Sequence, residues 1–249
     1  MTRAAGQALE HAQVVLGYST YIDLIRPLLK DKEILSSGMR KEVDRVHEAV
    51  KTASQGTPCA LVSSGDPGIY ALAGLVFEIC RESGIPLGRD PGQIQVEVVP
   101  GVSALSAGAA LLGSPLTTDF AVISLSDLLT PWQRIEKRIR ASAEADFVLV
   151  LYNPKSKKRN WQLEAARNMI LEYRDADTPV GLVTAAMRPE QSVCLFTLAG
   201  LDCSRADMQS TVFIGNSETF VYHDRMVTPR GYKNKYDLTL GKETYKRTT

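Results

Sequence analysis

Three segments of the sequence place small, turn-forming residues directly after apolar runs. They read SSGDPG (63–68), VVPGVSA (98–104) and LYNPKS (151–156). If each apolar run is a β-strand, small residues at its end let the backbone approach a ligand, and a helix that follows offers free N–H groups. One such loop is usually only a turn, because Gly, Asp and Pro are the residues that turns require. Three of them favour a ligand-binding cleft, although their spacing does not name the ligand.

The first half of the chain alternates strand-like and helix-like segments, which is typical of an α/β fold with a mainly parallel sheet. Apolar runs occupy residues 13–17, 59–65 and 95–101. Between them, apolar residues recur at intervals of three and four, as they do in amphipathic helices. Open α/β sheets bind small molecules at the carboxyl ends of parallel strands, so the loops stand where such a site is expected.

The second half begins in the same style and then changes. Further strands are expected at 120–126, 146–154, 180–186, 192–201 and 211–216. From residue 192 the connections are too short for a crossover helix, which indicates antiparallel strands in a mixed sheet. A polar stretch with Gly and Pro at 113–119 is the expected joint. We therefore expect an N-terminal α/β domain (1–116), a C-terminal α/β domain (117–232) and a tail (233–249).

Composition limits the kinds of partner. The chain has 249 residues, of which 44% are hydrophobic and 23% charged, as in ordinary globular proteins. Its net charge of +1 gives no general attraction to nucleic acid or to an anionic membrane. The four cysteines form no C-x-x-C pair and lie far from the three histidines, so no disulfide framework or metal site is expected. Without an apolar membrane span or signal peptide, the cytoplasm is the expected location.

Several motifs follow one another in a fixed order: SGDPGIYALAG, VVPGVSALSAGAALLG, ISLSDLLTPW, LYNPKSKKR, and IGNSETF with MVTPRGY. On these motifs the chain resembles the tetrapyrrole (corrin and porphyrin) methylase family, from about Val14 to Tyr232. GDPG and PGVS are common to the family, whereas SLSDLLTPW, LYNPKSK and TPRGY resemble the members that methylate ring carbon C(17). The resemblance implies two α/β domains with S-adenosylmethionine in a cleft between them, usually in a homodimer.

The resemblance also implies which residues contact the cofactor. They are Gly65, Asp66, Pro67, Gly68 and Ile69 in the first loop, Ser103 and Ala104 in the second, and Asn153 in the third. This fits their chemistry, since Asp66 can accept hydrogen bonds from hydroxyl or ammonium groups and glycines expose backbone donors and acceptors. The alternative for Asp66 is an Asx-turn that only caps its own loop.

A basic run stands just before the helix expected near Asn160, and it consists of Lys155, Lys157, Lys158 and Arg159. Cations at a helix N-terminus are unfavourable by about 0.3 to 1 kcal/mol each, so the run needs another reason. The acetate and propionate carboxylates of a corrin precursor would supply one, and a solvated surface loop is the alternative. Arg230 is assigned to the substrate in the same way. Asp127 is a candidate for proton transfer at the substrate.

The implied activity is methyl transfer from S-adenosylmethionine to a tetrapyrrole ring carbon, namely C(17) methylation with ring contraction in cobalamin biosynthesis. The substrate carbon is the nucleophile, so the protein mainly aligns the reactants and excludes water, and no catalytic Ser, Cys or His is required. Two alternatives stay open. The chain could methylate another ring position, or it could bind a tetrapyrrole or nucleotide without turnover.

One departure from the family pattern concerns the beginning of the chain. The family normally opens with a strand and a glycine-rich G-x-G-P-G loop, whereas residues 1–12 resemble its first helix. Either the start is shortened or the protein lacks part of the substrate trough that this loop helps to build. We expect the chain as given to be a poor catalyst, because misplacement of the reactants by about 1 Å can cost roughly 100-fold in rate.

Overall fold

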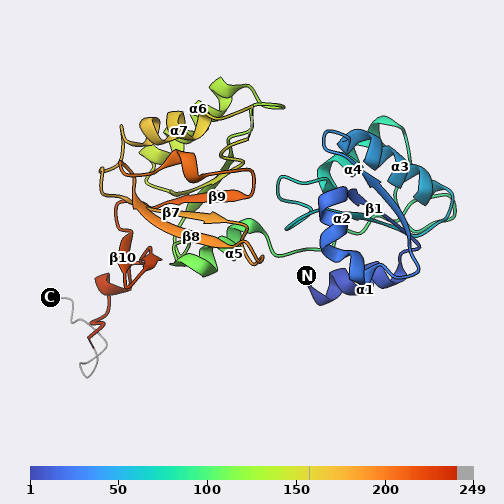
Figure 1. Cartoon of the computed structure of the whole chain (residues 1–249), viewed down its shortest axis with the longest axis horizontal. Helices are drawn as coiled ribbons and strands as arrows, with labels where there is room; N and C mark the ends of the chain where they lie inside the picture. Colours follow the sequence, from blue (N-terminus) through green and yellow to red (C-terminus); the bar gives the residue numbers. More distant parts are fainter. Residues whose placement is uncertain (157, 240–249) are drawn as a thin grey trace. The chain divides into compact units, whose positions relative to one another are not determined.

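A computed structural model describes residues 1–156 and 158–239 of the chain. The chain divides into two compact units, Met1–Ser103 and Ala104–Thr249, which are described separately below (Figure 1). This boundary lies earlier than the expected one after residue 116. The reason is that helix α5 (Ala104–Leu112) belongs to the second unit, where Leu112 packs with Val183 and Phe213.

The first unit contains a three-stranded parallel sheet in the order β2-β1-β3. The strands are β1 (Val14–Tyr18), β2 (Glu33–Ser37) and β3 (Cys59–Val62). The helices are α1 (Arg3–His11), α2 (Ser19–Ile25), α3 (Glu42–Ser54) and α4 (Ala73–Glu82), with a short 3-10 helix η1 (Arg26–Leu28).

The central strand β1 explains how this unit is layered. Side chains alternate between the two faces of a strand, and Val15 packs with Leu9 and Ile22 on one face. Its neighbour Leu16 packs with Ala49 on the other face. Both faces of the sheet are therefore covered by helices. Since β3 runs parallel to β1, the GDPG loop that follows β3 stands at the carboxyl edge of this sheet.

The expected strand at 95–101 is wrong, because no strand forms there. The segment begins beside an isolated bridge between Leu87 and Ile94, and Val98 remains 42% exposed. A strand requires a neighbour that pairs with its backbone, and within the described residues β3 pairs with β1 alone. By contrast, β2 was not expected, because the sequence EILSS is too short and polar to stand out.

The second unit contains a five-stranded mixed sheet in the order β5-β6-β9-β7-β8. Its strands are β5 (Phe120–Ser124), β6 (Val148–Tyr152), β7 (Pro179–Thr184), β8 (Ser192–Thr197) and β9 (Ser210–Ile214). A small second sheet joins β10 (Phe220–Tyr222), β11 (Arg225–Val227) and β4 (Gly113–Ser114). The remaining elements are α6 (Trp132–Glu144), α7 (Gln162–Ile170), η2 (Cys203–Arg205) and η3 (Tyr232–Asn234).

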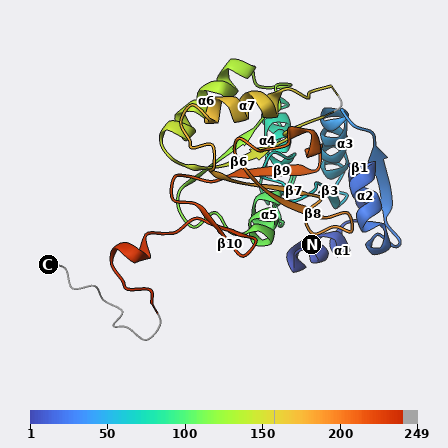
Figure 2. The same ribbon diagram turned by 60° about the vertical axis from the view of Figure 1, so that its left-hand side comes forward.

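The strand directions confirm the expected mixed sheet. Strands β5 and β6 are parallel, whereas β9 runs antiparallel to β6 and β7, and β8 runs antiparallel to β7. Helices α6 and α7 cover one face and α5 the opposite face (Figure 2). Because β6 and β7 both run antiparallel to β9, they are parallel to each other, and the carboxyl ends of β5, β6 and β7 share one edge.

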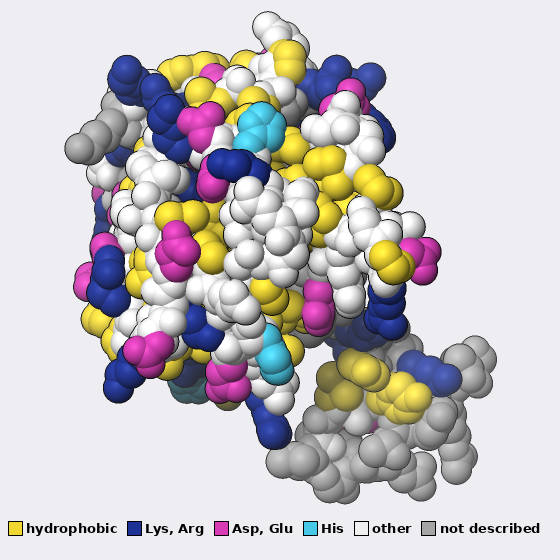
Figure 3. All heavy atoms as spheres, turned by 90° about the vertical axis from the view of Figure 1, so that its right-hand side faces the viewer, with side chains coloured by type: hydrophobic (Ala, Val, Ile, Leu, Met, Phe, Trp, Pro, Cys, Tyr) yellow, Lys and Arg dark blue, Asp and Glu magenta, His cyan; other side chains and the backbone are white. Residues whose placement is uncertain are grey.

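On the face drawn in Figure 3, Lys and Arg side chains are scattered among acidic, neutral and apolar ones and form no single basic patch. Within residues 1–156 and 158–239, no helix is both long and apolar enough to cross a membrane.

Candidate active site

The loop after β3 is folded around the carboxylate of Asp66. Oδ1 accepts a hydrogen bond from the Gly68 N–H at 2.8 Å, which is the Asx-turn that the sequence left as an alternative. Oδ2 accepts a second hydrogen bond from the Gly101 N–H at 3.1 Å. Asp66 therefore joins the GDPG loop to the PGVS loop. The cofactor contact remains a prediction, for which each carboxylate oxygen still has accepting capacity.

Close backbone packing between these two loops explains one of the glycines. A Cβ atom on Gly101 would overlap the backbone carbonyl oxygen of Gly65, so a side chain at this position would force the loops apart. Gly65 itself has a φ of 72°, a conformation that favours glycine. Beside them, Ile69 leaves 36% of its surface exposed. The first unit thus brings its predicted loop residues together, and the buried Ser103 ends the unit.

In the second unit, the predicted residues Ala104 and Asn153 lie near each other. Ala104 opens α5, and the next N–H, that of Leu105, donates to the Tyr152 hydroxyl at 2.6 Å. Asn153 follows β6 with a φ of 51°, and its Nδ2 donates to Ser124 Oγ at 3.0 Å. The start of α5 and the ends of β5 and β6 therefore meet at one edge of the five-stranded sheet.

A charged cluster stands at the same edge, just beyond β5 and β6. Asp127 Oδ2 accepts a hydrogen bond at 3.0 Å from Nε2 of Gln162, whose side chain is buried at the start of α7. Burial lowers the pKa of Arg159, and the nearby negative charge of Asp127 opposes this shift. Within the described residues, Arg159 Nε and Nη1 are buried and have no hydrogen-bond partner. Asp127 and Arg159 thus lie close enough for their charges to interact, and their contacts with the substrate remain predictions.

Among the described residues, the other cations predicted to bind substrate differ from Arg159 in their partners or their exposure. Lys155 Nζ donates to the backbone carbonyls of Cys203 and Ser204 at 3.4 and 3.1 Å, so this ammonium fixes η2 to the loop. Lys157 lies outside the described residues. Arg230 is exposed, and no hydrogen bond or ion pair among the described residues joins it to the Arg159 cluster. Substrate contacts from Lys155, Lys157 and Arg230 remain predictions.

Sequence reasoning missed two features of this edge. One is Gln162, which fixes Asp127 but belongs to no motif used for the prediction. The other is Ala185, the residue directly after β7, which is buried and has a φ of 49°. A left-handed alanine costs roughly 1 to 2 kcal/mol, and such strain tends to collect at functional sites. The sequence feature that could have indicated Ala185 is the run VTAA (183–186), in which a further apolar strand ends in small residues.

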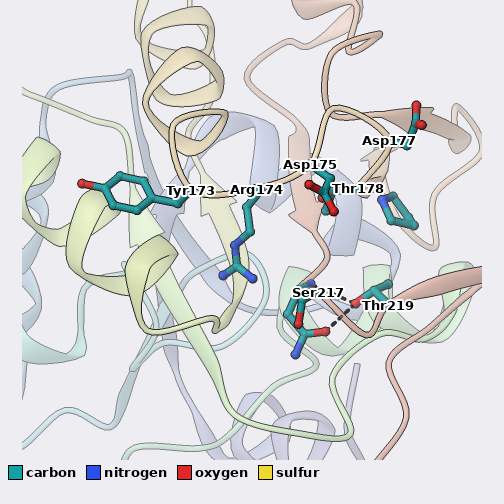
Figure 4. A pocket seen from close by; sticks show the side chains of 9 residues that line it. Tyr173, Arg174, Asp175, Asp177, Thr178, Ser217 and Thr219 are labelled. Carbon is teal, nitrogen blue, oxygen red and sulfur yellow. Dashed lines mark hydrogen bonds between the residues drawn. The ribbon is translucent and has the colours of Figure 1, made fainter.

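A cavity of about 210 Å³ lies at the opposite edge of the same sheet, beside the first residue of β7 (Figure 4). There the buried Arg174 forms an ion pair with Asp146 and donates to the Phe147 carbonyl at 2.9 Å. Asp146 in turn accepts hydrogen bonds from the N–H and hydroxyl of Ser217. These contacts tie strand ends together, and none of the predicted site residues lines this cavity.

Over residues 1–156 and 158–239, no group of three or more His, Cys, Asp or Glu side chains is placed to hold a metal ion. The candidate site residues fall into two groups, which are the loops around Asp66 in the first unit and Asn153 with the Asp127, Gln162 and Arg159 cluster in the second.

The fold places this chain among the α/β proteins, a class that typically binds small molecules at the carboxyl ends of parallel strands. Comparison with known proteins names the family. Residues 1–202 match the model of the Tetrapyrrole (Corrin/Porphyrin) Methylases, and the chain belongs to this family. The family resemblance and the methyltransferase class expected from the sequence are thereby confirmed.

Within this family, the chain is similar to several individual methyltransferases. The chain is 47% identical over 238 residues to the Cobalt-factor III methyltransferase of Priestia megaterium, covering 96% of this chain but 44% of that protein. It is 44% identical to the Probable cobalt-factor III C(17)-methyltransferase of Salmonella typhimurium, covering 93% of each. Among solved structures, the methyltransferase CobJ is similar with a TM-score of 0.85 and 32% identity, covering 92% of this chain and 93% of CobJ. The expected α/β fold class is confirmed.

Proposed function

We propose that this chain transfers a methyl group from S-adenosylmethionine to C(17) of a tetrapyrrole in cobalamin biosynthesis, with contraction of the ring. The observation that carries the proposal is its 44% identity to the Salmonella typhimurium relative, which extends over 93% of both chains. A similarity of this extent includes both units and every loop of the candidate site.

In this reaction the main task of the protein is to place the methyl donor and the acceptor carbon in line. When bound, S-adenosylmethionine supplies a methyl group on a positively charged sulfur. A substrate ring carbon donates the electron pair to that methyl, the carbon–sulfur bond breaks, and a neutral thioether remains. The residues of this chain then have to hold both molecules in line and exclude water, which can account for a large share of the rate enhancement.

The loop pair of the first unit suits the cofactor. Gly65 and Gly101 let the two loops pack closely, Asp66 keeps accepting capacity, and Ile69 offers an exposed apolar surface. We assign cofactor contacts to Gly65, Asp66, Pro67, Gly68, Ile69, Ser103, Ala104 and Asn153. We further propose that the protein forms a homodimer, which sedimentation of the purified chain would test. The proposed location is the cytoplasm.

The test is a methyl-transfer assay with S-adenosylmethionine carrying an isotopically labelled methyl group and cobalt-factor III as acceptor. We expect the product to gain one labelled methyl, and NMR to place it at C(17). Label at another ring carbon would support the alternative methylase. If no label is transferred and calorimetry detects no cofactor binding, the proposal is wrong.

A further inference from the structure

Arg159 is the charged side chain of the candidate site whose hydrogen-bonding capacity is least used. Its Nε and Nη1 are shut off from water and find no acceptor among the described residues. An unpaired buried N–H is costly, and such a group in a folded protein calls for an explanation, such as an absent ligand. Five N–H donors in a planar fork make guanidinium a specific partner for carboxylates.

The neighbours of Arg159 do not satisfy it. Asp127 is close enough to affect its pKa but forms no ion pair with it, and one carboxylate oxygen of Asp127 is already bound to Gln162. Lys155 is bound to backbone carbonyls, and Lys158 is exposed to water. Within the described part of the basic run, Arg159 is thus the cation that combines burial with unused donors.

We propose that Arg159 binds a carboxylate side chain of the tetrapyrrole substrate. This inference rests on the proposed function, since it names how that function's substrate is recognised. The carboxylate would replace the atoms that now shield Nε and Nη1.

Apolar residues beside the cluster favour a tetrapyrrole over a small anion. Leu128 and Leu129, which directly follow Asp127, are 77% and 99% exposed. Trp161 is 47% exposed and packs edge-to-face on Trp132, with ring centroids 4.8 Å apart. A large apolar ring with peripheral carboxylates would cover such residues and reach Arg159 at the same time. A small inorganic anion would leave them in water.

The two tryptophans of the chain, Trp132 and Trp161, provide the measurement. Binding of a porphyrin with acetate and propionate side chains is followed by quenching of their fluorescence, with the methyl ester of the same porphyrin as the matched ligand. Arg159→Gln should weaken binding of the acid by about 10- to 100-fold. Lys158→Gln, one residue away and exposed, should change it by less than about 2-fold. The wild-type protein should bind the ester about as weakly as Arg159→Gln binds the acid.

Equal affinities of Arg159→Gln and Lys158→Gln for the acid would overturn the inference. So would equal affinity of the wild-type protein for acid and ester, a comparison that still decides if Arg159→Gln does not fold. Cofactor affinity should be the same in wild type and Arg159→Gln. If the wild type transfers methyl but the KM for the tetrapyrrole is unchanged in Arg159→Gln, the inference fails and the proposed function stands. If the wild type transfers none, the proposed function fails.

Discussion

The loop pair around Asp66 and the cluster around Arg159 differ in whether the charged side chain has hydrogen-bond partners within the protein. Both oxygens of Asp66 accept backbone hydrogen bonds, from Gly68 and Gly101, so this charge is satisfied without a ligand. In Arg159, by contrast, the shielded atoms Nε and Nη1 lack hydrogen-bond partners among the described residues. The first site is therefore pre-formed, whereas the second keeps bonding capacity for a ligand.

This difference predicts how each site responds to mutation. Removing a satisfied group breaks existing hydrogen bonds, so changes in the loop pair should lower both stability and cofactor affinity. Removing an unsatisfied group breaks none, so Arg159→Gln should leave the free energy of unfolding unchanged or raise it. The variants below test that contrast, from the largest expected effect to the smallest.

Gly101→Ala should have the largest effect. Its Cβ would overlap the Gly65 carbonyl oxygen, and because the obstacle is backbone, the two loops must separate. Overpacking of this kind costs about 1 to 3 kcal/mol in the free energy of unfolding, and we expect a value near the upper end. Cofactor affinity should fall with it, as measured by denaturant unfolding and calorimetry.

Gly74→Ala in α4 is the matched control for this substitution. No atom lies within 4 Å of its Cβ position, and alanine favours helices, so stability should stay the same or rise by up to about 1 kcal/mol. Equal unfolding curves for the two alanine variants would show that the loops are not as closely packed as the structure has them.

Asp66→Ala should weaken cofactor binding without unfolding the protein. It leaves the N–H groups of Gly68 and Gly101 without their acceptor, which costs about 1 to 3 kcal/mol. Asp66→Asn keeps one carbonyl oxygen and should fall between alanine and wild type. An unchanged affinity for S-adenosylmethionine in Asp66→Ala would sink the cofactor assignment and leave Asp66 as a structural residue.

Two substitutions of Asn153 separate its backbone from its amide group. Asn153→Gly keeps the left-handed backbone at little cost, whereas Asn153→Ala should be about 1 kcal/mol less stable, because a φ of 51° disfavours alanine. Both lose the side chain and should lose cofactor affinity alike. If both bind the cofactor as wild type does, Asn153 is no cofactor contact.

Lys155→Met should have the smallest effect and separates the two kinds of cation in the basic run. Loss of the ammonium contacts to Cys203 and Ser204 should cost about 0.5 to 1.5 kcal/mol of stability, while porphyrin affinity stays near wild type. Lys158→Met, which loses no such contact, should change neither quantity. A drop in porphyrin affinity as large as that of Arg159→Gln would instead support the predicted substrate contact of Lys155.

Much of the fold could be predicted, because local patterns determine it. Apolar runs such as VVLG (14–17) and VLVL (148–151) become buried strands, and the short connections after residue 192 become antiparallel strands. Whether the segment 95–101 forms a strand could not be predicted from its local pattern. Its apolar pattern is that of a strand, but strand formation depends on a partner elsewhere in the chain, which a local pattern does not reveal.

The candidate site was predictable only where a motif marks it. GDPG, PGVS and LYNP are visible in the sequence, but the hydrogen bond from Gly101 to Asp66 joins residues far apart in the chain. Four cations stand in the basic run, and only their burial and partners distinguish Lys155 from Arg159. The hydrogen bond from Gln162 to Asp127 and the left-handed backbone of Ala185 belong to no sequence motif, so they became visible only in the structure.

The most direct test of the whole account measures two affinities in two variants by calorimetry, for S-adenosylmethionine and for the carboxylate porphyrin. Asp66→Ala should lose affinity for the cofactor by about 10-fold or more and keep that for the porphyrin. Arg159→Gln should do the reverse. If either variant loses affinity for both ligands to the same extent while remaining folded, the division between a cofactor loop pair and a substrate cluster is contradicted.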